Sequence, residues 1–234
     1  EDATAHQRRL GGPDTRIING QDARRGRFPW WVFLRGPADC GGDSCGSALI
    51  APDLVLTAAH CGGCINRGEI GKYDTSDRQE GGPIRLIESS LPHPNWEGEI
   101  PYNDIMIVKL DGTVANAQPI RLNFDENVPS ETGETLLMLG LGSITDGVNE
   151  PVQRASILQE SSTEYFAFED CAVATDPTYG SAFGNSLQDT AVTGDWFCTI
   201  LNEPERYAHC FGDSGGPIII EGSSASEDVL VAII

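Results

Sequence analysis

The sequence lacks the long apolar runs and the basic surplus that suit a protein to a lipid bilayer or to nucleic acid. No apolar run approaches the 18 or more residues that a spanning helix needs, and candidates such as Leu136 to Leu139 are short. Only 15 lysines and arginines stand against 35 acidic residues, for a formal net charge of −20 over 234 residues. Because so negative a surface repels phosphate backbones and anionic lipids, we expect neither nucleic acid nor a membrane as a partner.

The chain also lacks helical periodicity, internal repeats and low-complexity tracts. Residues 1–16 are polar, and structure is expected to begin near Ile17, which opens an apolar stretch that continues to Leu34. Glycine, proline, asparagine and aspartate then separate short β-like runs, which predict an all-β fold, and the polar segment 123–134 is a candidate bridge between two halves. These runs cover residues 48–56, 84–87, 105–110, 135–141, 195–201, 217–220 and 229–234.

The first ten residues lack the basic start and apolar middle of a secretion signal, so we expect that any such signal has been removed. Cysteine usage is the better guide to the compartment. Among the seven cysteines, only Cys61 and Cys64 have the two-residue gap of a zinc-binding pair, and no second pair follows. Disulfides in an oxidising, extracellular compartment are therefore favoured over a zinc site, and we expect no metal and no cofactor.

Three motifs carry the chemistry: Thr57-Ala58-Ala59-His60-Cys61, Asn103-Asp104 followed by the apolar run to Leu110, and Gly212-Asp213-Ser214-Gly215-Gly216-Pro217. Taken singly, a histidine beside a cysteine is often structural, and an aspartate before a strand often caps a turn. Together, in the order His, Asp, Ser, they resemble the chymotrypsin and trypsin family of serine peptidases. Further segments share the resemblance: Arg16 to Gly20, Cys45 to Ile50 and His93 to Trp96.

The resemblance implies two antiparallel β-barrels packed side by side, with substrate in the cleft between them. Residues 1–16 would form a propeptide, 17–124 the first barrel with His60 and Asp104, and 125–234 a second barrel with Ser214 that is incomplete at its C-terminal end. Ser214 would be the nucleophile, His60 the general base and acid, and Asp104 the residue that orients the imidazole. The backbone N–H groups of Gly212 and Ser214 would form the oxyanion hole.

The same resemblance implies activation and substrate choice. A cut between Arg16 and Ile17 would release an amino group that pairs with Asp213, as in a zymogen. Since that cut follows an arginine, a separate trypsin-like protease is the expected activator. The primary pocket would be lined by Ala208, His209 and Phe211, which supply no carboxylate, so we expect apolar or aromatic specificity of the chymotrypsin or elastase type.

Cysteine pairing is partly implied by the resemblance, which matches Cys45 with Cys61 and Cys171 with Cys198. Cys40 and Cys64 lie just outside the first pair, so we predict an additional bridge between them. Cys210 resembles a cysteine whose partner follows the serine motif, and no cysteine follows here. Lys72 stands where a calcium-binding loop of the family would carry a carboxylate, which argues against such a site.

The expected function is that of a secreted, monomeric serine endopeptidase that acts on polypeptides, with a proteinaceous inhibitor as a further candidate partner. The alternative is a non-catalytic homologue that serves as a binding or regulatory module, because the fold alone does not establish catalysis. The unmatched Cys210 and the end of the sequence at Ile234 also lead us to expect little activity from this chain by itself.

Overall fold

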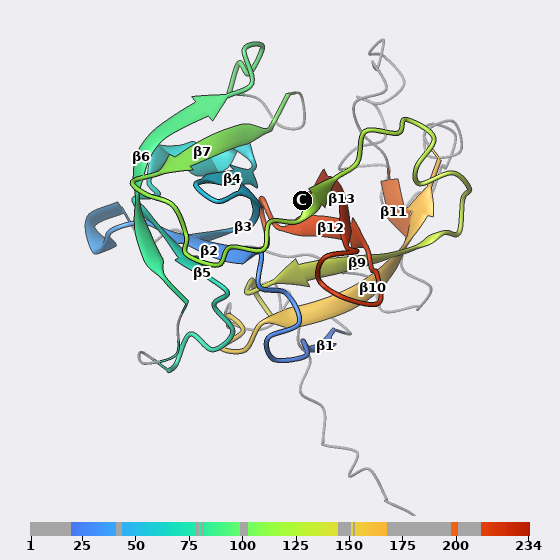
Figure 1. Cartoon of the computed structure of the whole chain (residues 1–234), viewed down its shortest axis with the longest axis horizontal. Coiled ribbons are helices and arrows are strands. Elements are labelled where there is room, and N and C mark those ends of the chain that lie inside the picture. The colour runs from blue at the N-terminus through green and yellow to red at the C-terminus, as the bar shows by residue number, and fades with distance from the viewer. Residues whose placement is uncertain are drawn as a thin grey trace, which may run out of the picture.

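Short strands make up most of the structure, a computed structural model that describes residues 20–40, 44–77, 80, 82–98, 103–144, 151, 153–167, 198–200 and 212–234. The two helical elements in these ranges are single 3₁₀ segments, η1 (Ala38–Cys40) and η2 (Ala59–Gly63). The strands form two sheets that lie beside each other (Figure 1). The predicted all-β fold of the chymotrypsin type is therefore confirmed.

The first sheet is a closed barrel of six strands, seen on the left of Figure 1, in the order β2-β3-β4-β7-β6-β5. Each neighbouring pair is antiparallel. Side chains of a strand point alternately into and out of the barrel, and Met106, Val108 and Leu110 of β7 are accordingly buried while the residues between them are exposed. The strands are β2 (Trp31–Arg35), β3 (Ser44–Ala51), β4 (Leu54–Thr57), β5 (Arg67–Ile70), β6 (Ile84–Pro92) and β7 (Met106–Leu110).

The second sheet has the order β1-β10-β9-β12-β13-β8, with β11 paired to β10. The pairing of β13 with β8 is parallel, and the other pairings are antiparallel. Both β1 and β8 precede residue 124, yet they hydrogen-bond to this sheet, so the chain crosses between the sheets before and after the closed barrel. The strands are β1 (Gln21–Asp22), β8 (Arg121–Leu122), β9 (Thr135–Gly140), β10 (Gln159–Phe166), β11 (Cys198–Ile200), β12 (Pro217–Ile220) and β13 (Val229–Ile233).

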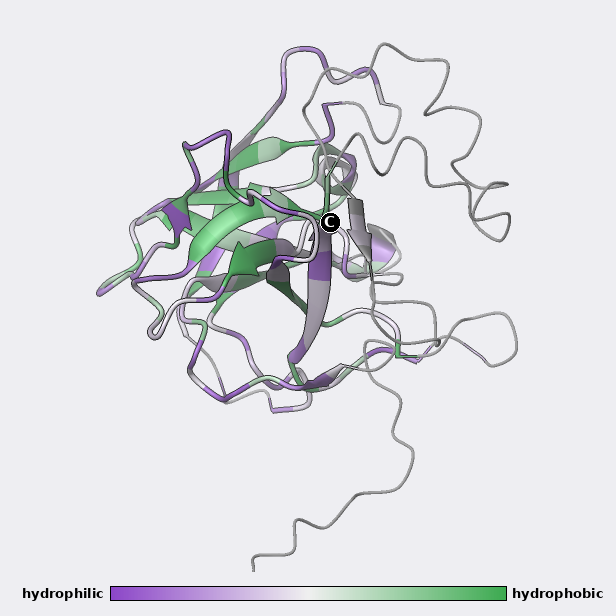
Figure 2. Cartoon of the chain, turned by 90° about the vertical axis from the view of Figure 1, so that its right-hand side faces the viewer, coloured by the Kyte–Doolittle hydropathy of each residue, from purple (hydrophilic) through white to green (hydrophobic). Residues whose placement is uncertain are grey.

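One apolar core joins the two sheets: Trp31 and Leu34 of the barrel belong to the same buried cluster as Leu139 and Ile219 of the second sheet. Figure 2 shows the apolar strands gathered inside, with polar residues frequent in the loops. Burying a side chain of this size contributes about 1.5–3 kcal/mol to folding. The core therefore fixes how the two sheets sit against each other.

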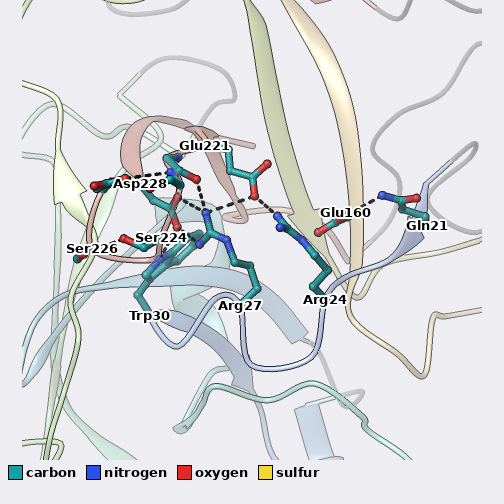
Figure 3. A network of polar contacts seen from close by, with 12 residues as sticks. Gln21, Arg24, Arg27, Trp30, Glu160, Glu221, Ser224, Ser226 and Asp228 are labelled. Carbon is teal, nitrogen blue, oxygen red and sulfur yellow. Dashed lines mark hydrogen bonds and ion pairs between the residues drawn. The ribbon is translucent and has the colours of Figure 1, made fainter.

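A buried ion pair also connects the sheets (Figure 3). Arg27, just before β2, donates from Nη1 and Nη2 to the two carboxylate oxygens of Asp228, both at 2.6 Å, across a sequence separation of 201 residues. The side chain of Asp228 is fully buried, and it also accepts from Trp30 Nε1 at 3.1 Å and from Gly222 N at 2.9 Å. The Arg27 pKa is raised, first by its hydrogen bonds to Asp228. Around this pair, Arg24 contacts Glu221 at the surface.

Some predicted strand bounds differ from those observed. The run 48–56 is two antiparallel strands rather than one, because Pro52 and Asp53 form a turn between β3 and β4. The run 195–201 is described as a strand only from Cys198 to Ile200. Strand β10 was not predicted, because its buried residues include the polar side chains of Gln159, Glu160, Ser161 and Thr163.

Candidate active site

His60 and Asp104 lie at the same end of the barrel because of strand register. In the antiparallel pair β4–β7, Thr57 lies opposite Met106. His60 follows Thr57 by three residues in the 3₁₀ segment η2, and Asp104 precedes Met106 by two. The two motifs that the sequence singled out are therefore brought together at one barrel rim.

The two side chains are held in one orientation by a pair of hydrogen bonds. Asp104 Oδ2 lies 2.6 Å from His60 Nδ1, and Asp104 Oδ1 accepts from the His60 backbone N–H at 2.8 Å. Because a carboxylate only accepts, Nδ1 carries a proton and Nε2 is left as the basic nitrogen. Burial of Asp104 by itself raises its pKa, but the hydrogen bonds from the His60 side chain and backbone outweigh burial, and the net pKa is lowered. The aspartate is thus ionised at neutral pH.

Ser214 is positioned next to this pair from the second sheet. Its carbonyl oxygen accepts from Gly46 N of β3 at 2.9 Å, and it lies 3.8 Å from Cys61 Sγ. The same sulfur lies 3.9 Å from His60 Nε2. Within the described residues, Ser214 Oγ makes no hydrogen bond to Nε2, and in sites without substrate such bonds are often long.

The turn that carries Ser214 requires glycine after it. Gly216 N donates to Asp213 O at 2.8 Å and closes a four-residue turn in which Gly215 has φ +73°. A Cβ on Gly215 would lie 2.1 Å from Thr57 Oγ1, so the second sheet approaches the first as closely as a bare backbone allows. The six-residue serine motif therefore allows the two sheets to pack closely, in addition to carrying the residues that point to chemistry.

The backbone N–H groups around this turn differ in whether they have a hydrogen-bond acceptor. Gly215 N donates to Ile234 O at 2.6 Å, and Gly216 N is used by the turn itself. In the part of the chain that the structure describes, neither Gly212 N nor Ser214 N has a hydrogen-bond acceptor. An oxyanion hole requires backbone N–H groups that are not already bonded, and within the described residues these two meet that condition.

Asp213 points away from that surface into the second sheet. Its side chain is fully buried, and Oδ1 accepts from Gly142 N at 2.7 Å. A Cβ on Gly142 would lie 2.4 Å from the Asp213 carboxyl carbon, so the carboxylate fills the space that a larger residue would take. The structure thus holds a buried carboxyl group directly behind the Ser214 turn.

The structure joins Cys45 to Cys61 in a disulfide, as the resemblance implied. Cys64 is also disulfide-bonded, and its predicted partner Cys40 has a side chain outside the described residues. Cys45, Cys61 and His60 place three possible metal ligands within 4.8 Å of one another. The two sulfurs are bonded to each other and are not thiolates, so this group does not have the chemistry of a metal site.

Lys72 is buried, and its ammonium is enclosed by its own loop. Nζ donates to the carbonyl oxygens of Asp77 and Glu80, both at 2.9 Å, and lies 3.8 Å from Glu69 Oε2. The Lys72 ammonium, a cation of the chain itself, is thus surrounded by three oxygen atoms.

Several predicted site residues lie outside the described residues. They comprise Arg16 and Ile17 of the activation site, Ala208, His209 and Phe211 of the primary pocket, and the cysteines Cys171 and Cys210. Cys198 is described in its backbone only, so its predicted pairing with Cys171 stays a prediction.

Comparison with known proteins agrees with this geometry. Residues 17–233 match the family described as Trypsin. The chain belongs to the trypsin family. Curated relatives include kallikrein-4 of Homo sapiens, 28% identical over 216 residues that cover 91% of this chain and 76% of that protein. Trypsin of Squalus acanthias is 29% identical over 89% of this chain and 82% of the relative, and mast cell protease 3 of Ovis aries is 27% identical over 90% and 78%.

Trypsin-family membership establishes the fold and the serine peptidase family. Among the described residues, we find no helix with the length and apolar character needed to cross a membrane.

Sequence reasoning did not single out Arg154, which the structure places beside the Ser214 turn. Its guanidinium lies beside Gly212, because a Cβ on that glycine would be 3.7 Å from Arg154 Cζ. Nothing in the local sequence signals this, since Arg154 lies between Gln153 and Ala155 in the β9–β10 connection and meets Gly212 only through the fold.

Proposed function

We propose that this protein is a secreted serine endopeptidase that hydrolyses peptide bonds through His60, Asp104 and Ser214 and an acyl-enzyme. The observation that carries the proposal is the hydrogen-bonded pair of His60 and Asp104, with Ser214 fixed next to it from the second sheet. His60 Nε2 would take the proton of Ser214 Oγ as the hydroxyl attacks the carbonyl carbon, and would then give it to the leaving amine. Asp104 would stay ionised and stabilise the imidazolium.

The tetrahedral intermediate would be held by the N–H groups of Gly212 and Ser214. Their lack of acceptors among the described residues supports this role, since both can turn to a developing oxyanion. Losing one such donor typically costs about 3 kcal/mol of transition-state stabilisation.

We further infer that the chain is a zymogen, cut after Arg16 by a separate trypsin-like protease. The support is the buried carboxylate of Asp213, immediately behind the Ser214 turn. A new ammonium at Ile17 that pairs with Asp213 would fix the turn between the two oxyanion donors. Specificity for apolar or aromatic side chains is proposed from Ala208, which would leave a cationic side chain without a counter-charge.

The disulfide Cys45–Cys61 and the bonded Cys64 support an extracellular, oxidising compartment for the proposed enzyme. A polypeptide is the proposed substrate, and a proteinaceous inhibitor that covers the same cleft is a further proposed partner.

The test is covalent labelling by a fluorophosphonate probe before and after a cut at Arg16. We expect faster labelling of the cut protein at Ser214 than of the uncut protein, and none in Ser214→Ala or His60→Ala. The alternative, a non-catalytic homologue, predicts no labelling in either form. Equal labelling rates before and after the cut would overturn the zymogen proposal alone.

A further inference from the structure

A pocket of about 210 Å³ opens between the closed barrel and the β9–β10 connection. Its apolar lining comes from Phe33, Leu141 and Ala155, all buried, and its polar lining includes Arg35, Ser44 and Arg154. Among the described residues that line the pocket, none is acidic. The pocket therefore combines a small apolar wall with two guanidinium groups.

The pocket adjoins the candidate active site through Arg154. Nη1 of this arginine donates to Ser44 Oγ at 2.5 Å, and Ser44 directly precedes the bridged Cys45. On its other side, the guanidinium lies beside Gly212, the proposed oxyanion donor. A group bound by Arg154 thus sits close to the bond that the proposed enzyme would cleave.

The position of Arg154 is set by backbone contacts on both sides. Ala155 N donates to Gly142 O at 2.9 Å, and Ser143 forms an isolated β-bridge with Arg154. Thr75, a further lining residue, donates from its N–H to Ser156 O at 2.7 Å. The Arg154 side chain therefore extends from a backbone segment that is held by contacts on both sides.

The charged side chains that line the pocket in the described part of the chain, Arg35 and Arg154, are both cationic. Glu69 lies 3.6 Å from Arg35, 3.3 Å from Arg67 and 3.8 Å from Lys72, so one carboxylate is shared by three cations. Among the described residues, Arg154 has no carboxylate within ion-pair distance. In a chain of net charge −20, the charged groups of the described pocket lining are therefore of the opposite sign to the net charge.

We propose that this pocket binds the carboxylate of a glutamate or aspartate in the polypeptide substrate, at one position flanking the scissile bond, with Arg154 as the main specificity determinant. The inference rests on the proposed peptidase function. Guanidinium groups form short, often bidentate hydrogen bonds with carboxylates, and the apolar wall would pack against the methylene groups of the ligand. Arg35, paired with Glu69, contributes less.

The experiment uses the protein cut after Arg16 and fluorogenic peptides that carry Glu, Gln or Lys at each of three positions before and after the bond. We expect kcat/KM to be about 10-fold higher for Glu than for Gln at one position, and this ratio to fall as salt rises. Arg154→Gln should bring the ratio close to 1, and Arg154→Lys should restore part of it because the charge returns without the fork of donors.

Arg121→Gln, an exposed arginine of β8 on the second sheet, serves as the matched control and should leave the ratio unchanged. Folding of each variant is checked by its labelling rate at Ser214. A Glu/Gln ratio near 1 in the unaltered protein, or a ratio that survives Arg154→Gln, overturns the inference while the peptidase function stands.

A second measurement separates the two proposals. In Ser214→Ala, which cannot turn over substrate, the Kd of the Glu peptide should be lower than that of the Gln peptide, and Arg154→Gln should remove the difference. If no peptide is cleaved yet this difference is found, the peptidase proposal fails and the pocket inference holds. Equal Kd values for the two peptides overturn the pocket inference.

Discussion

The two halves of the candidate site are built by different means. The barrel half, with His60 and Asp104, is fixed by side-chain hydrogen bonds of 2.6 and 2.8 Å and by a disulfide. The half on the second sheet, with Ser214, is fixed by backbone packing so close that Gly215 leaves no space for a Cβ. The hydrogen bonds of the first half therefore set the chemical state of His60 and Asp104, and the packing of the second half sets the position of Ser214. Substitutions in the two halves should therefore have different effects.

The largest effect is expected in the barrel half, from substitution of Asp104. Asp104→Asn should lower kcat of the cut protein about 10⁴-fold, because the amide favours the wrong imidazole tautomer while the shape stays the same. The free energy of unfolding should change far less than the activity. Asp111→Asn, an exposed aspartate at the other end of β7, is the control and should retain full kcat. A loss of less than 10-fold in Asp104→Asn would contradict the assigned role.

The next largest effect is expected on the free energy of unfolding, from loss of the buried ion pair between Arg27 and Asp228 that joins the two sheets. Asp228→Ala should lower the free energy of unfolding by about 4 kcal/mol, because it leaves Arg27 without its buried partner and removes the acceptor of Trp30 Nε1. Arg24→Ala, which breaks only the exposed pair with Glu221, should cost less than 1 kcal/mol. Denaturant titration of both variants checks this, and equal costs would show that burial of the pair is not what matters.

The packed half can be tested with two glycines of nearly equal φ. Gly215→Ala should cost about 3 kcal/mol of stability and slow labelling of Ser214, because backbone strain adds to a clash with Thr57. Gly26, with φ +75° and nothing within 4 Å of an added Cβ, isolates the strain, and Gly26→Ala should cost about 1 kcal/mol. If the two variants unfold at the same denaturant concentration, close approach of the sheets is not the constraint.

The smallest effect is the pH dependence that Asp104 gives to stability. Its folded-state pKa is lowered below the unfolded value, so the stabilisation is fully present above the unfolded pKa of about 3.9 and is lost as pH falls through the folded value. The free energy of unfolding should thus decline more steeply below pH 4 in the unaltered protein than in Asp104→Asn. Parallel curves for the two proteins would show that this aspartate is not stabilised in its charged form.

The sequence predicted those parts of the molecule whose causes are local. The motifs around His60, Asp104 and Ser214 and strands such as β7 carry their own pattern, because alternation and turn residues act over a few positions. Strand β10 was missed because its buried residues include Gln159 and Glu160, and polar side chains inside a sheet give no apolar alternation.

The contacts that join distant segments were also beyond local reasoning. Arg27 meets Asp228 across 201 positions, and Arg154 meets Ser44 across 110. Neither pair has a sequence spacing that marks it, because the fold alone decides which polar residues become neighbours. The pocket beside Gly212 was therefore visible only in the structure.

Lys72 has a consequence for how its loop responds to the surrounding solution. A dissolved cation stabilises a loop by mass action, so its effect grows with concentration and disappears when a chelator is added. The ammonium that donates to Asp77 and Glu80 is present once per molecule at any dilution, since it is covalently part of the loop. This part of the fold should therefore keep the same shape whatever the ionic composition of the fluid in which the protein acts.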